Sequence, residues 1–282
     1  NKEMKKREIK TSMQFNNDVG FFLDKINFKI KNKIQIKYKW VKKLTEYKNY
    51  LKKKDCYKKN KKFINSFRFI KSLSETLRGG ENIVTDMGTS FTCTMQSFEI
   101  KTGQRLFTSS GIAAMGFGIP GILGAYFGDK KKLPICITGD GGLMFNIQEL
   151  HTLINYKIPV KIFIINNGGY LTMKLMQKKN FQKFVGSDDN SGLTLPKFLN
   201  VAKAFDFDVF KLNSETKLSQ KLNKILRSKK PTVCEIMTPP MQELVPRVQT
   251  QMNKDGTFEP AMLDNMYPFL DKEIVKKSDL IF

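Results

Sequence analysis

The chain has 282 residues, of which 40% are hydrophobic and 27% charged, and its formal net charge is +23 at pH 7. This composition fits a globular protein and excludes a disordered one. No uninterrupted apolar run reaches the roughly 18 residues of a membrane span, and the polar, basic start is unlike a secretory signal. The four cysteines have no C-x-x-C spacing and the only histidine is His151. These features predict a cytoplasmic protein with reduced thiols and no zinc site.

The positive charge is concentrated in the first part of the chain. Residues 1–80 contain 24 Lys and Arg against 7 Asp and Glu, a net of +17, whereas residues 81–282 carry only +6. Such a segment could attract nucleic acid or anionic lipid. We favour a solvated basic linker over residues 37–62, because this stretch has no recognisable nucleic-acid motif. Nucleic-acid binding through the basic segment is kept as an alternative.

The apolar pattern predicts the following elements in chain order. Residues 1–36 are interpreted as the end of a preceding domain, with a short amphipathic helix in NNDVGFFLDKINFKI. After the linker, helices and strands alternate as far as residue 240, and residues 241–282 form a C-terminal tail. Helices are predicted over 63–77, 120–128, 145–156, 196–206 and 218–228. Strands are predicted over 81–88, 133–139, 159–167, 208–212 and 231–238.

Two of these strands are continuous apolar runs, LPICITG (133–139) and PVKIFIINN (159–167). Continuous runs are typical of strands covered on both faces of a parallel sheet. Strands that alternate with helices predict an α/β fold, a doubly wound parallel sheet with helices on both faces. The domain that contains it is predicted to span residues 63–240.

Polar side chains follow both apolar strands. Asp140 lies among glycines in GDGG, and Asn167 ends the second strand. Ligands of open parallel sheets bind beyond the carboxyl ends of the strands, so these two side chains can converge. A carboxylate and an amide oxygen suit Mg²⁺ or Ca²⁺. Gly139, Gly141 and Gly142 leave room for a phosphate near the backbone, and the N-terminus of the next helix favours an anion. The sequence therefore predicts a metal-bound diphosphate.

The motif GDG followed at a distance by NN resembles the signature of thiamine-diphosphate-dependent enzymes. The surrounding segments are similar to the acetolactate synthase (acetohydroxyacid synthase) large-subunit family and to its relatives in sugar and lipopolysaccharide biosynthesis. They are SSGIAAMGFGIPGILGA (109–125), GDGGLMFNIQEL (139–150) and VKIFIINNGGYLTM (160–173). The resemblance covers roughly residues 63–240 and corresponds to the C-terminal diphosphate-binding domain of the family.

The resemblance implies a role for individual positions on the metal and diphosphate side. Asp140, Asn167 and the backbone carbonyl of Gly169 match the Mg²⁺ ligands of the family. Gly141 and Gly142 match the diphosphate cradle.

On the ring side, Met115 matches the apolar residue that supports the folded cofactor, and Ala113 the carbonyl that accepts a hydrogen bond from its aminopyrimidine. Thr89 and Ser90 stand where a preceding loop contacts the diphosphate. Tyr170 is also expected among the cofactor-binding residues.

The sequence departs from the family pattern at three points, and these limit what the resemblance implies about the substrate and the activity. Met176 replaces a larger side chain near the substrate entrance, and the tail 242–270 is closer to the sugar-associated relatives. The glutamate that activates the cofactor belongs to an N-terminal pyrimidine domain, and nothing in this sequence matches that domain. We therefore expect no catalytic residue within the chain.

Three competing interpretations are weaker. The segment 116–121 satisfies G-x-G-x-x-G, but the stretch before it is a poor strand, so an NAD site is not favoured. His151 is interpreted as a packing or surface residue of its helix. TSSGI does not match the G-x-S-x-G pattern of serine nucleophiles.

These observations predict the part of an acetolactate-synthase-like enzyme that binds thiamine diphosphate and Mg²⁺ and acts on 2-oxo acids by decarboxylation or carboligation, as a lyase or transferase. The resemblance implies a homodimer, a tetramer or a partner chain that carries the pyrimidine domain, and little turnover by the isolated chain. A catalytically inert interaction module with the same fold is the principal alternative.

Overall fold

The computed structural model describes residues 12–30, 38–53, 57, 59–247, 250–252, 257–260 and 267. The chain divides into two compact units, one formed by residues 1–54 with 272–282 and the other by residues 55–271. In the first unit, α1 (Val19–Ile30) confirms the predicted amphipathic helix. The basic segment predicted as a linker instead contains a 16-residue helix, α2 (Tyr38–Lys53).

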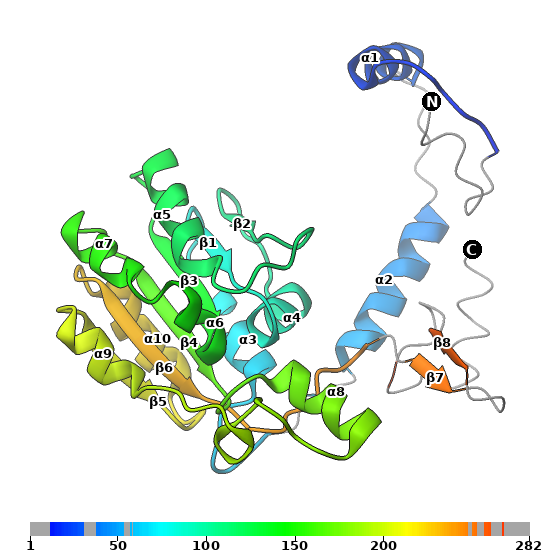
Figure 1. Cartoon of the computed structure of the whole chain (residues 1–282). Coiled ribbons are helices and arrows are strands. Elements are labelled where there is room, and N and C mark those ends of the chain that lie inside the picture. The colour runs from blue at the N-terminus through cyan, green and yellow to red at the C-terminus, as the bar shows by residue number, and fades with distance from the viewer. Residues whose placement is uncertain are drawn as a thin grey trace. The chain divides into compact units, whose positions relative to one another are not determined.

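The second unit contains a six-stranded sheet in the order β2-β1-β3-β4-β6-β5, and every pair of neighbours is parallel (Figure 1). This arrangement confirms the predicted doubly wound α/β fold. The strands are β1 (Asn82–Thr85), β2 (Arg105–Phe107), β3 (Pro134–Gly139), β4 (Lys161–Asn166), β5 (Asp208–Leu212) and β6 (Thr232–Met237).

Helices cover both faces of this sheet. Their bounds are α3 (Ser66–Thr76), α4 (Thr89–Ser97), α5 (Gly118–Gly128), α6 (Asp140–Leu143), α7 (Glu149–Asn155), α8 (Leu171–Phe181), α9 (Phe198–Ala204) and α10 (Leu218–Arg227). Short 3₁₀ turns η2 (Met144–Asn146) and η3 (Asp189–Ser191) complete the unit. Two short strands, β7 (Thr250–Met252) and β8 (Phe258–Pro260), form an antiparallel pair in the tail, and most of the remaining tail lies outside the described residues.

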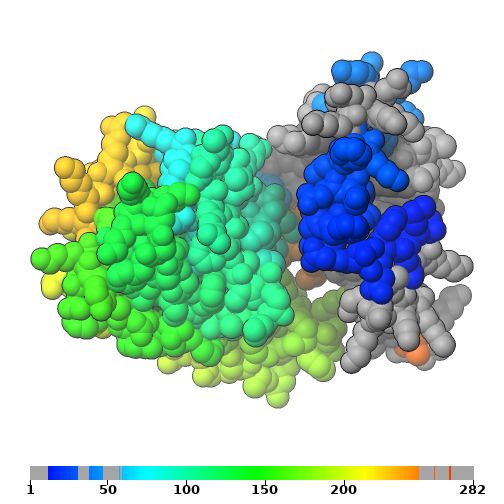
Figure 2. Space-filling view, turned by 90° about the horizontal axis from the view of Figure 1, so that it is seen from above, coloured from blue at the N-terminus to red at the C-terminus, as the bar shows by residue number. Residues whose placement is uncertain are grey.

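Two hydrophobic cores form because successive side chains of a strand point to opposite faces. In β4, Phe163 and Ile165 pack with helices α3 and α10, whereas Ile162 and Ile164 pack with α5, α7 and α9. All four side chains are fully buried. This explains why the strand is continuously apolar. In Figure 2 the teal segments between β1 and α5 lie beside the green segments from α5 to β4 on one outer face.

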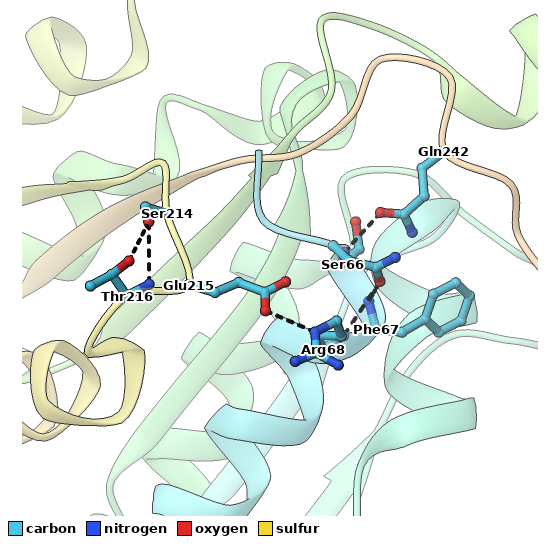
Figure 3. Close-up of polar contacts among 8 residues, drawn as sticks. Ser66, Phe67, Arg68, Ser214, Glu215, Thr216 and Gln242 are labelled. Atoms are coloured by element: carbon cyan, nitrogen blue, oxygen red, sulfur yellow. Dashed lines mark hydrogen bonds and ion pairs between the residues drawn. The ribbon is translucent and has the colours of Figure 1, made fainter. Parts of the chain in front are cut away.

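Polar contacts join α3 to segments far away in the sequence (Figure 3). The Nε atom of Arg68 donates to Oε2 of Glu215 at 2.8 Å, and the backbone N–H of Ser66 donates to Oε1 of Gln242 at 2.9 Å. Helix α3 starts at Ser66 because the side chain of Asn65 accepts from the backbone N–H groups of Phe67 and Arg68. These contacts fix the helix that covers one face of the central strands.

Besides α2, the helices α4, α6 and α8 and the strands β2, β7 and β8 were not predicted from the sequence. Helix α4 (TSFTCTMQS) is rich in threonine and has low helical propensity, and it is stabilised by packing, since its residues Cys93 and Thr94 are buried. Helix α8 distributes its apolar side chains around the axis instead of along one face. Strand β2 has only three residues. No helix within the described part of the chain is long and apolar enough to cross a membrane.

The packing predicts a large loss of stability for Phe163→Ala. The Phe163 ring is fully buried, and its centroid lies 5.6 Å from that of Phe69. Truncation should leave a cavity and lower the free energy of unfolding by about 3 to 5 kcal/mol. Urea unfolding followed by circular dichroism would measure it. Phe181→Ala is the matched control, because this side chain is 68% exposed; equal losses for the two variants would contradict the assigned core.

Candidate cation and diphosphate site

Asp140 and Asn167 lie at the carboxyl ends of the adjacent strands β3 and β4, where only 1% and 3% of their surfaces are exposed. Oδ2 of Asp140 accepts hydrogen bonds from the backbone N–H groups of Asn167 at 3.0 Å and Gly169 at 2.9 Å. Oδ1 accepts from the backbone N–H of Gly141 at 2.8 Å. The carboxylate therefore connects the end of its own strand to the loop that follows the neighbouring strand.

The burial of Asp140 changes its acidity. Desolvation raises the pKa of the carboxyl group to about 6, and the hydrogen bonds from Gly169, Gly141 and Asn167 only partly offset that rise. A carboxylate kept in such a place without a cation is costly. A divalent ion would favour the ionised form.

The amide oxygen of Asn167 provides the test of whether a cation fits here. Oδ1 of Asn167 is buried and has no hydrogen-bond partner. An orphaned buried oxygen is uncommon and calls for an unrecorded water or ion. Oδ1 of Asp140 accepts from the backbone N–H of Gly141, and a carboxylate oxygen has further lone-pair capacity that a metal could use. One carboxylate and one amide oxygen are hard ligands that suit Mg²⁺, and the residues present therefore fit a divalent cation.

Two of the glycines beside Asp140 allow other side chains to pack closely against the backbone, and only Gly139 leaves open space. A Cβ atom on Gly142 would lie 2.9 Å from Oδ2 of Asp86, and a Cβ atom on Gly141 would collide with the ring of Tyr170. Gly139 faces open space. The helix that begins here, α6, has only four residues and is followed by η2 and α7. The single helix predicted over 145–156 is thus broken, and the field of a long helix does not point at this spot.

A pocket at this edge of the sheet contains all but two of the predicted site residues. Ser90 is fully buried beneath it, and its hydroxyl donates to the backbone carbonyl of Met87 at 2.9 Å. Ala113 lies in an exposed turn with a φ of +56°. The pocket is lined by Met87, Gly88, Thr89, Met115, Gly139, Asp140, Gly141, Gly142, Asn167, Gly169, Tyr170, Leu171, Thr172 and Met173.

The sequence analysis missed a buried lysine beneath the loop after β4. Lys174 is 1% exposed, and its Nζ donates to the backbone carbonyl of Asn167 at 3.2 Å. Desolvation lowers the pKa of Lys174, against the influence of Asp188 and Asp140. A lysine among apolar residues in LTMKLM is the signal in the sequence. Its charge lies close to the candidate cation site.

The loop that follows α8 packs against residues 169 and 170, which follow β4. The backbone carbonyl of Ser187 accepts from the N–H of Tyr170 at 2.9 Å, and the φ of Gly169 is +131°. A Cβ atom on Gly169 would collide with that carbonyl of Ser187. Gly169 therefore has to be glycine for both conformational and steric reasons. This contact holds Tyr170 at the wall of the pocket.

The fold and the site together define a class of protein. A doubly wound sheet places a carboxylate, an unpaired amide oxygen and a glycine-rich turn at its carboxyl edge, as expected for a nucleotide- or diphosphate-binding α/β domain. The family described as "Thiamine pyrophosphate enzyme, C-terminal TPP binding domain" matches residues 86–236. The chain belongs to this family; thiamine pyrophosphate is another name for thiamine diphosphate.

Curated relatives agree with this assignment. The chain is 30% identical to the acetolactate synthase large subunit of Lactococcus lactis subsp. lactis (strain IL1403) over 79% of its own length and 38% of that protein. It is 28% identical to "Acetolactate synthase 2, chloroplastic" of Zea mays over 69% of its own length and 31% of that protein. The chain thus spans about a third of the length of these relatives. It contains the thiamine-diphosphate-binding domain of acetolactate-synthase-like enzymes.

The raised pKa predicts how Asp140 influences stability. The unfolded carboxyl group titrates near 3.8 and the folded one near 6, so the folded chain binds the proton more tightly and wild-type stability falls as the pH rises through this interval. The free energy of unfolding of the wild type minus that of Asp140→Asn should therefore fall by about 2 kcal/mol between pH 4 and pH 7, somewhat less than the full shift, because the unfolded carboxyl group is already partly ionised at pH 4. Urea unfolding without divalent cations would measure this difference. A difference that is independent of pH would contradict the assignment.

Proposed function

We propose that this chain binds thiamine diphosphate through Mg²⁺ and is part of an enzyme that acts on 2-oxo acids. The observation that carries the proposal is the buried Oδ1 of Asn167, which has no hydrogen-bond partner among the described residues and belongs to a pocket that Asp140 also lines. When bound, the cofactor supplies the carbanion chemistry of decarboxylation and carboligation. The chain supplies placement of the cofactor and a pocket with little water.

In this proposal, Asp140, Asn167 and the backbone carbonyl of Gly169 hold the Mg²⁺ ion. The orphaned oxygen and the free lone pair of Asp140 support the first two ligands. The third rests on the resemblance alone. Lys174 offsets part of the negative charge of the site without occupying the metal position, because its Nζ already donates to a backbone carbonyl.

The diphosphate is proposed to lie along Gly139, Gly141 and Gly142, with Thr89 and Ser90 on its other side. Thr89 lines the pocket, whereas the hydroxyl of Ser90 already donates to Met87. Ser90 would therefore contact a phosphate only through its backbone or after this hydrogen bond breaks.

The ring side of the cofactor is proposed to contact Met115 and Tyr170, which line the pocket. The carbonyl of Ala113 would accept a hydrogen bond from the pyrimidine. The positive φ of Ala113 shows a specialised turn at this position and supports the proposed role.

A second polypeptide segment is proposed to complete the site. The glutamate that activates the cofactor in this family is absent from this domain, and we propose that a pyrimidine domain of another subunit or chain provides it. Apolar side chains near the pocket are 37% to 55% exposed, which supports a covering partner. They are Met115, Met144, Phe145, Met173 and Met176.

Two further attributes remain proposals. The predicted boundaries at 63–240 are proposed as those of the cofactor-binding domain. The cytoplasm is proposed as its location, and the buried free thiols of Cys93, Cys136 and Cys234 in the described part of the chain are compatible with a reducing compartment.

Isothermal titration with thiamine diphosphate would test the cofactor assignment. The wild type should give heat of binding with Mg²⁺ and none after addition of EDTA. Asp140→Ala should abolish the heat, and Asn167→Ala should weaken binding by roughly tenfold or more, because each removes a proposed metal ligand.

Asn223→Ala in α10 is the matched control, because Asn223 bonds only within its own helix, to the carbonyl of Ser219, and its binding should equal that of the wild type. Absence of Mg²⁺-dependent heat in the wild type would favour the inert interaction module.

The proposed incompleteness makes a separate prediction. Residues 1–282 alone, saturated with cofactor and Mg²⁺, should decarboxylate pyruvate little or not at all, because the activating carboxyl group is missing. Release of CO₂ in a coupled assay would measure this. Turnover that disappears in Asp140→Ala would show that the chain carries a complete site and would overturn the prediction.

A further inference from the structure

Asp86 is a buried acid that has no part in the proposed function. It follows strand β1 and is 1% exposed. Its Oδ1 accepts from the backbone N–H groups of Met87 at 2.8 Å and Gly116 at 3.0 Å, and its Oδ2 accepts from the hydroxyl of Thr138 at 2.9 Å. The carboxylate thus joins the end of β1, the loop before α5 and the end of β3.

This carboxylate is held by neutral donors in a place that disfavours charge. Burial raises the pKa of Asp86, and the hydrogen bonds from Met87, Thr138 and the backbone of Gly116 and Gly118 act in the opposite direction. A buried carboxyl group with so many donors stabilises one arrangement of the segments that supply them. All of these segments border the candidate pocket.

Gly116 is held from a second side by Asn146. Nδ2 of Asn146 donates to the backbone carbonyl of Gly116 at 2.9 Å, so both polar groups of this residue are fixed by side chains. The φ of Gly116 is +85°, and a Cβ atom there would lie 2.6 Å from Cβ of Phe145 and 2.9 Å from Nδ2 of Asn146. Only glycine fits between these neighbours.

Met115 immediately precedes Gly116 in the sequence. It lines the pocket and is 38% exposed. A partly exposed side chain on a loop is not held in place by packing alone. The backbone at Gly116 is the nearest rigid point, and it is rigid because Asp86 and Asn146 bind its N–H and its carbonyl. The position of Met115 therefore depends on these two side chains.

We propose that Asp86 and Asn146 are positioning residues, which clamp the backbone of Gly116 from both sides and so hold Met115 against the ring portion of the bound cofactor. This inference rests on the proposed binding of thiamine diphosphate. It assigns a role to two side chains that need not touch the metal or the diphosphate. It also predicts that substitution of Asp86 or Asn146 weakens the binding of the ring portion of the ligand and leaves the binding of its pyrophosphate portion unchanged.

The test compares two ligands on the full chain in the presence of Mg²⁺. Thiamine diphosphate is expected to bind both at the cation site and against the side chain of Met115. Inorganic pyrophosphate is expected to bind at the cation site alone. Asp86→Ala and Asn146→Ala should each weaken thiamine diphosphate binding by about tenfold, the effect of one misplaced apolar contact, and leave pyrophosphate binding within about twofold of the wild type. Asp86→Asn keeps one acceptor oxygen for the Gly116 N–H and should restore most of the affinity.

Controls separate positioning from general destabilisation. Glu81 is a buried acid at the amino end of β1 that accepts from the backbone of Arg78 at 3.0 Å. Glu81→Gln should leave the affinity for both ligands unchanged. Asn146 is only partly buried, so Asn146→Ala keeps the test valid if Asp86→Ala does not fold.

An equal loss for both ligands in the clamp variants, or no loss for either, would overturn the inference. Equal affinity of the wild type for pyrophosphate and thiamine diphosphate would show that the ring portion adds nothing to binding. The inference would then fail, whereas the proposed cation site would be retained. If the wild type binds neither ligand, the proposed function itself is wrong, and the inference falls with it.

Discussion

Two hydrogen bonds accepted by Oδ2 of Asp140, from the backbone N–H groups of Asn167 and Gly169, tie the ends of β3 and β4 to each other. Parallel strands bring their carboxyl ends to one edge of a sheet, but they do not determine the path of the loops that follow. In this protein Asp140 helps to determine the loop after β4, because the backbone N–H groups of Asn167 and Gly169 turn toward its Oδ2. Lys174 holds the same loop through the carbonyl of Asn167. Asp140 and Asn167 thereby line the same pocket.

Such an arrangement is stable only with compensation for the buried charge. The raised pKa of Asp140 reflects the cost of desolvation, and three backbone donors reduce that cost without removing it. The ammonium group of Lys174 lies nearby, and the orphaned oxygen of Asn167 remains unpaired. A divalent cation would satisfy both the charge and the unpaired oxygen, so the features that are unfavourable in the chain alone are the ones that favour the ligand.

Two opposite walls enclose the place proposed for the cofactor, and each depends on a close approach to glycine. On one side the carbonyl of Ser187 packs against Gly169 and accepts from Tyr170. On the other side Asp86 and Asn146 hold Gly116 next to Met115. A side chain at Gly169 would displace the Ser187 carbonyl, and a side chain at Gly116 would displace Phe145 or Asn146. Backbone contacts therefore position Met115 and Tyr170, two side chains that line the pocket.

The sequence by itself determined the fold class, and it pointed to Asp140 and Asn167 as the central pair of the candidate site. Continuous apolar runs followed by GDG and NN are typical of buried parallel strands with polar groups at their ends, so β3 and β4, and the position of Asp140 and Asn167 at their ends, were predictable from local pattern. Helices α4 and α8 lack a one-sided apolar pattern, and their position depends on packing. The roles of Asp86, Lys174 and Ser187 were decided only by the tertiary structure. Each makes hydrogen bonds with groups that only the fold brings close. A single sequence does not show which N–H or carbonyl group a buried residue will contact.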